Sequence, residues 1–198
     1  MAADQRHAAL PRRGAGFALL AVIVTVVIVI TLATAVVITL SGDNDQMRIE
    51  RVADVLHRIA AELDTTQAAS GQSFVAQVGI YPLHLSHLYT KITSADSQCK
   101  YKPYGNGAAP NWRGPYHLVP IASTGHQLGP GFFADDTLSI VGKTDLQIVI
   151  RNVALEDAKA LEMYVEKKSD GSGPIVTYSP TTGTSPVILK YHLTVSGC

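Results

Sequence analysis

The hydrophobic pattern is dominated by one long apolar run near the start of the chain. Phe17 to Leu40 is a stretch of 24 residues without a charged side chain. A helix rises about 1.5 Å per residue and the hydrocarbon core of a bilayer is roughly 30 Å thick, so about 20 apolar residues can cross it. We therefore predict the transmembrane half of a long helix at 17–40, preceded by a short leader at 1–16.

A different periodicity follows directly after this run. Between residues 41 and 64, apolar side chains recur at spacings of three and four, and charged side chains occupy the other face. The sequence predicts the amphipathic half of the helix here, with one stripe able to pack on a sheet. Two alternatives stay open at Ser41-Gly42: a helix that begins again near Gly42, or one helix from Phe17 to about Leu63. The apolar stripe consists of Ile49, Val52, Ala53, Leu56, Ile59, Ala60 and Leu63.

Residues 65–198 are expected to form one globular domain. Its first residues, 65–73, are small and polar and predict a linker or loop. A short helix is expected around Leu83–Tyr89 and a longer one over Ala154 to Lys167. Three strands are predicted, and the last alternates apolar and polar residues as a half-buried strand does. These strands are Leu146 to Ile150, Ile175 to Tyr178 and Val187 to Val195, with a hairpin loop at Thr181–Thr184 before the last.

These elements predict an α+β fold class. The long N-terminal helix, with its transmembrane half and its amphipathic half, would pack on a small antiparallel sheet. The chain carries 16 Lys and Arg against 16 Asp and Glu, so its formal net charge is zero. Without a basic excess, a dedicated nucleic-acid-binding function is disfavoured, and we expect no nucleic-acid partner.

The two cysteines, Cys99 and Cys198, are too far apart in sequence for a CxxC redox or zinc motif. Arg6, Arg12 and Arg13 precede the apolar run, and the positive-inside rule places such a leader in the cytoplasm and the globular domain outside it. Thiols in a bacterial periplasm are oxidised enzymatically, so we expect a Cys99–Cys198 disulfide. Two free thiols are the alternative.

The N-terminal segment has three interpretations. It could be a cleavable secretory signal with a site at Ala33-Thr34-Ala35, although the apolar run continues beyond that site. It could equally be an uncleaved signal anchor. The third interpretation comes from resemblance: an Arg-rich leader, Gly16 and then Phe17 resemble the class III signal of type IV pilins and type II secretion pseudopilins.

In that family a prepilin peptidase cuts after the glycine, and the new N-terminal phenylalanine is usually methylated. The resemblance therefore implies that Gly16 is the processing residue and Phe17 the mature N-terminus. The family usually has a glutamate at the fifth mature position, where this chain has Ala21. Certain minor subunits at a filament tip also lack that glutamate, so a minor subunit is implied.

Two segments of the globular domain add to the resemblance. Gly79-Ile80-Tyr81-Pro82 before a short Leu-rich helix resembles the corresponding pseudopilin segment. Asn111-Trp112-Arg113-Gly114-Pro115-Tyr116 resembles the W-x-G-P-Y segment of the major pseudopilin class. For Trp112 and Tyr116 themselves we expect core packing beside a turn, rather than a ligand platform.

The sequence signals for metal binding and catalysis are weak. His84 and His87 could share a helix face as metal ligands, but no third ligand stands near them in sequence. Asp135, Asp136 and Asp170 could bind calcium, yet they lack EF-hand spacing. The sequence contains no G-x-S-x-G, HExxH, Walker A or GxGxxG arrangement. We therefore expect no catalytic activity, no metal and no cofactor.

The sequence-based hypothesis is a pilin-like or pseudopilin-like structural subunit of a bacterial type IV pilus or type II secretion filament. Its expected partners are prepilin peptidase, other pilin or pseudopilin subunits and the inner membrane. Its expected location is the bacterial inner membrane as a single-pass protein, with the C-terminal domain in the periplasm and possible incorporation in a filament. The alternative is a membrane-anchored periplasmic binding or structural protein without a filament role.

Overall fold

The structure is a computed structural model of the chain, and it describes residues 15–64, 73–183, 186–195 and 198. The predicted leader, most of the predicted linker at 65–73, and Thr184 of the predicted hairpin loop lie outside this part. The chain divides into two units, one up to Asp45 and the other from Gln46 to Cys198. Within the first unit, only the side chains at 23, 24, 26, 27, 29, 44 and 45 are described.

One helix, α1, runs from Ala15 to Leu63, so the alternative of a new helix near Gly42 is not adopted. Among the described residues, however, no helix combines the length and the apolar character needed to cross a bilayer. The prediction of a transmembrane half at 17–40 rested on a count of uncharged residues, and such a count does not by itself establish a spanning helix. The prediction of a transmembrane half, and of the fold class that includes it, is therefore wrong. The structure supports a small antiparallel sheet with helices.

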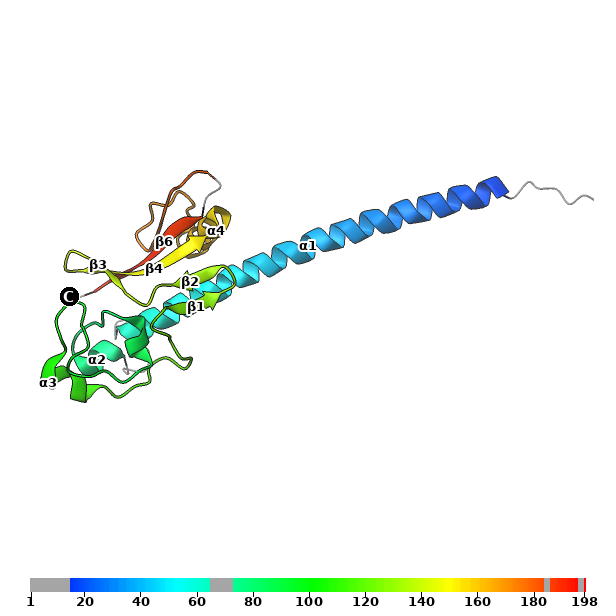
Figure 1. Cartoon of the computed structure of the whole chain (residues 1–198). Coiled ribbons are helices and arrows are strands. Elements are labelled where there is room, and N and C mark those ends of the chain that lie inside the picture. Colours follow the sequence, from blue (N-terminus) through cyan, green and yellow to red (C-terminus); the bar gives the residue numbers. More distant parts are fainter. Residues whose placement is uncertain (1–14, 65–72, 184–185, 196–197) are drawn as a thin grey trace, which may run out of the picture. The chain divides into compact units, whose positions relative to one another are not determined.

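The sheet of the second unit has the strand order β1-β2-β4-β6-β5, and β3 pairs with β4 beside this path (Figure 1). All of its neighbouring strands are antiparallel. The central strands β4 and β6 are the longest, which is consistent with their strong sequence patterns. The strands are β1 His126–Gly129, β2 Phe132–Ala134, β3 Ser139–Val141, β4 Asp145–Val153, β5 Val176–Ser179 and β6 Val187–Thr194.

The predicted strands at 146–150, 175–178 and 187–195 correspond to β4, β5 and β6. The predicted helix over Ala154–Lys167 is α4, and the short helix expected near Leu83–Tyr89 is the 3-10 helix η1. The structure adds elements that the pattern did not predict, namely α2, α3, η2 and strands β1 to β3. The helices of this unit beyond α1 are α2 Phe74–Val78, η1 Leu85–Leu88, α3 Gly105–Ala108, η2 Ala109–Asn111 and α4 Leu155–Glu166.

The core lies between the end of α1 and the sheet. Every member of the predicted apolar stripe, from Ile49 to Leu63, is at most 5 % exposed. Alternate residues of β6 are buried with them, because successive strand side chains point to opposite faces. Gly129 at the end of β1 allows the close approach of this strand, since a Cβ there would lie 2.8 Å from a methyl group of Val52.

Candidate functional site

The predicted processing residues lie at the start of α1. Gly16 and Phe17 are the second and third residues of this helix. The leader residues before Ala15 and the side chain of Phe17 fall outside the described part. The processing role of Gly16 and Phe17 therefore remains a prediction.

Further along α1, apolar side chains are exposed on several sides of the helix. Ile23, Val24, Val26 and Val29 are between 48 % and 58 % exposed. Successive helix residues are rotated by about 100°, so these four side chains together cover more than half of the helix circumference. We call these four residues the apolar helix surface. A helix that is apolar all round is normally buried by other elements, so this surface is the main candidate for assembly.

An ion pair fixes the beginning of the packed part of α1. The Arg48 guanidinium donates two hydrogen bonds to Asp157 of α4, at 3.0 and 2.5 Å, and a third to the Pro130 carbonyl at 3.1 Å. The side chains of Arg48 and Asp157 are 23 % and 21 % exposed, so the pair is partly screened from water. A planar guanidinium can bind both carboxylate oxygens with two parallel N–H groups and still donate to the carbonyl, whereas a lysine ammonium lacks this bidentate geometry. Arg48 thereby ties α1 to α4 and to the turn between β1 and β2.

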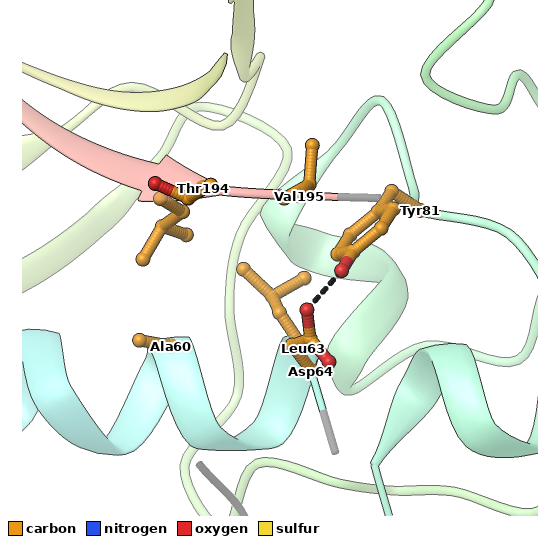
Figure 2. Close-up of a pocket in the computed structure, with 7 residues that line it drawn as sticks. Ala60, Leu63, Asp64, Tyr81, Thr194 and Val195 are labelled. Carbon is orange, nitrogen blue, oxygen red and sulfur yellow. Dashed lines mark hydrogen bonds between the residues drawn. The ribbon is translucent and has the colours of Figure 1, made fainter. Parts of the chain in front are cut away.

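Polar contacts also surround the last turn of α1. Tyr81 donates a hydrogen bond from its hydroxyl to the Asp64 carboxylate (Figure 2). These two residues line a small cavity with Ala60 and Leu63 of α1, Thr194 at the end of β6, and Val195 just after it. Its volume of about 20 Å³ is room for a single water molecule. The cavity is therefore too small for an organic ligand, and we assign it a structural role.

The expected disulfide is present between Cys99 and Cys198, whose Cα atoms are 5.7 Å apart. Cys99 is buried, and its backbone N–H donates to the Tyr81 carbonyl at 2.9 Å. The bridge therefore joins the segment that carries Tyr81 to the residues beyond β6. The sequence predicted this pairing, but not the hydrogen bond that joins Cys99 to Tyr81.

The W-x-G-P-Y segment packs against the core, as predicted for Trp112 and Tyr116. The two rings meet edge to face with their centroids 5.8 Å apart. The indole N–H of Trp112 donates to the His87 carbonyl at 2.9 Å, and the Tyr116 hydroxyl donates to Gln77 at 3.0 Å. Gly114 is required here, because a Cβ at this position would lie 2.8 Å from an indole carbon of Trp112.

The possible metal ligands make protein contacts instead. The His84 ring nitrogen Nδ1 lies 2.9 Å from the Asp136 carboxylate, and Asp135 pairs with Arg151 at 2.6 Å. Asp170 accepts two hydrogen bonds from Ser172, which lower the pKa of the Asp170 carboxyl. In the described part of the chain, no group of three or more His, Cys, Asp or Glu side chains could hold a metal ion.

Two buried contacts were not predicted from the sequence. Glu62 of α1 pairs with the buried His117, with Oε2 2.6 Å from Nδ1. Glu162 of α4 is fully buried and accepts hydrogen bonds from the backbone of Gly171 at 2.8 Å and Gly173 at 3.2 Å. The sequence contains one signal for the second contact. Glu162 lies next to Leu161 on the buried face of the predicted helix, where a charged side chain is unexpected. The partners in the first contact are 55 residues apart, and no sequence pattern links them.

Comparison with known proteins supplies no family assignment. No protein-family model, curated protein or solved structure matches this chain.

Proposed function

We propose that the protein is a pilin-like or pseudopilin-like structural subunit of a bacterial type IV pilus or type II secretion filament, and a minor subunit of it. Its role would be assembly rather than catalysis. The observation that carries this proposal is the apolar helix surface of Ile23, Val24, Val26 and Val29, exposed on several sides of α1.

Apolar side chains that point in several directions need more than one covering partner. Neighbouring helices of the same kind would supply this cover, because each copy presents the same kind of surface. Burial of apolar side chains is favourable by about 1.5–3 kcal/mol for each large aliphatic residue. A filament in which each α1 is surrounded by several others satisfies this requirement.

The sequence motifs support the same proposal. Gly16 and Phe17 would be the peptidase site and the mature terminus, with prepilin peptidase and other pilin subunits as partners. The disulfide agrees with a globular unit that functions in an oxidising compartment such as the periplasm. Ala21, in place of the usual glutamate, is the reason for proposing a minor subunit.

The proposal is tested by incorporation into filaments in the native host. Val26→Asp places a charge on the apolar helix surface, and we expect it to remove the protein from sheared, sedimented filaments by at least about tenfold, since burying an unpaired carboxylate is costly. Val29→Leu conserves the apolar character and should sediment as the wild type does.

Tyr101→Asp is the matched charge control, because Tyr101 is 66 % exposed and belongs to the other unit. It should leave incorporation unchanged. Equal incorporation of Val26→Asp and the wild type, at equal cellular protein levels, would contradict the assembly role of α1.

A further inference from the structure

Two histidine pairs in the second unit share one arrangement. In the first, the Asp136 carboxylate lies 2.9 Å from His84, and the His84 ring meets the His87 ring edge to face with centroids 5.3 Å apart. His87 is only 8 % exposed, and its Nδ1 lies 3.2 Å from the Tyr104 hydroxyl. We call Asp136, His84 and His87 the first cluster.

The second cluster consists of Glu62, His117 and His126. Glu62 lies 2.6 Å from His117, and the rings of His117 and His126 meet edge to face with centroids 5.0 Å apart. His117 is 4 % exposed and His126 is 8 % exposed. In both clusters, therefore, a carboxylate contacts one histidine, and a second, buried histidine contacts the first.

Both clusters hold the same part of the chain, residues 81–126. The first joins η1 to the residues after β2, where the Asp136 carbonyl and carboxylate also accept the Leu85 and Ser86 amides at 2.7 Å. The second joins the residues after Tyr116 to the last turns of α1 through Glu62. Within the segment, the Leu88 carbonyl accepts the amides of Tyr116 and His117 at 2.7 and 3.2 Å. Opening either cluster would therefore loosen the attachment of this segment to α1 and to the sheet.

A proton on the second histidine of either cluster is disfavoured in the packed state. Burial removes the water that would solvate the charge, and the first histidine lies directly beside it. For His87, these two causes lower the pKa to about 4, against the weaker opposing effects of Asp96 and Asp136. Burial and His117 lower the pKa of His126 in the same direction.

We propose that the two clusters make the packing of residues 81–126 acid-sensitive, so that proton uptake by His87 and His126 opens this segment while β4 and β6 stay paired. The Cys99–Cys198 disulfide keeps the opened segment attached to the residues beyond β6. The opening is therefore local and reversible. This acid-sensitive packing is independent of the proposed filament function.

The lowered pKa values determine the direction in which pH changes the packing of residues 81–126. A histidine with a normal pKa near 6.5 in the open state and about 4 in the packed state binds more protons when open. Packing is therefore complete above about pH 6.5 and weakens as the pH falls. His87 alone raises the opening constant about 30-fold between pH 7.5 and pH 5, and His126 adds to this change.

The test is hydrogen exchange of the full-length chain in mild detergent at about pH 7.5 and pH 5, corrected for the intrinsic pH dependence of exchange. We expect the corrected opening constant for the Leu85, Tyr116 and His117 amides to rise at least about 30-fold. Amides of β4 and β6 should change less than about threefold. Emission from Trp112, the single tryptophan, is a second readout because its indole contacts the His87 carbonyl.

The double variant His87→Gln, His126→Gln removes both titrating groups and should lose the acid-induced opening. His57→Gln is the matched control, because His57 is an exposed histidine outside both clusters. If the double variant does not fold, the wild type still decides: opening should take up protons at about pH 5 and almost none at about pH 7.5. Equal acceleration in β4 and β6, an opening that takes up no protons at about pH 5, or an unchanged pH profile in a folded double variant would overturn the proposal.

Discussion

Removal of the Cys99–Cys198 disulfide should cause one of the largest losses of stability available to a single substitution in this chain. The change we choose is Cys198→Ser, because Cys198 is partly exposed and a serine hydroxyl there can reach water. Cys99 then remains as a buried thiol, which behaves as a small apolar side chain. The substitution therefore removes the covalent link with little change in packing.

The expected loss of stability follows from the length of the loop that the disulfide closes. The two cysteines are separated by 99 residues in sequence. In the chain-entropy model, a bridge that closes a loop of about 100 residues stabilises the folded state by about 4.7 kcal/mol, because it restricts the unfolded chain. Domains of ordinary stability unfold with 5–15 kcal/mol, so this loss is a large share of the total.

Urea denaturation followed by Trp112 fluorescence measures this loss. With a slope of about 2 kcal/mol per molar urea, the unfolding midpoint should fall by about 2 M. The double variant Cys99→Ala, Cys198→Ser should lose almost the same amount as the single variant, since the bridge is lost only once. A single-variant loss below about 1 kcal/mol, or a double-variant loss twice as large, would refute this reasoning.

Three further predictions concern the second unit. Glu162→Gln should reduce the unfolding free energy by about 2 kcal/mol in urea denaturation, because the buried carboxylate accepts two backbone N–H groups and an amide has only one acceptor oxygen. An unchanged midpoint would contradict that account. Arg48→Met should cost about 2 kcal/mol, and a double-mutant cycle with Asp157→Asn should show coupling above about 1 kcal/mol, whereas additive losses would exclude a direct pair. Burial raises the pKa of Tyr178 and of Tyr191 to about 12, with nearby glutamates adding to the effect. The unfolded chain ionises first, so stability should be lost from about pH 10 upward, and early tyrosinate absorbance from both rings with no loss of structure would contradict this.

The elements predicted from the sequence are those with a long or regular pattern. The stripe that ends at Leu63 repeats over several helical turns, and β6 alternates over its whole length, so the burial of each is set by local periodicity. Strands β2 and β3 have three residues each, which is too short for an alternation to be recognised. Their positions depend on pairing with β4, and pairing partners distant in sequence leave no local signal.

The candidate site was predicted less completely than the fold. The disulfide followed from two cysteines and an oxidising compartment. The Arg48–Asp157 and Glu62–His117 pairs join residues 109 and 55 positions apart, and only the folded chain brings them together. The prediction of a transmembrane half was wrong. It was based on the length of an uncharged run, whereas the described residues contain no helix that is long and apolar enough to cross a bilayer.

The central claim is that this chain is processed and assembled as a pilin-like subunit. Mass spectrometry of the N-terminal peptide of the protein, isolated from its native host, tests it most directly. We expect the mature chain to begin at Phe17, with a methylated amine. A chain that begins at an unmodified Met1, or at Val36 after an ordinary signal cleavage, would contradict the claim.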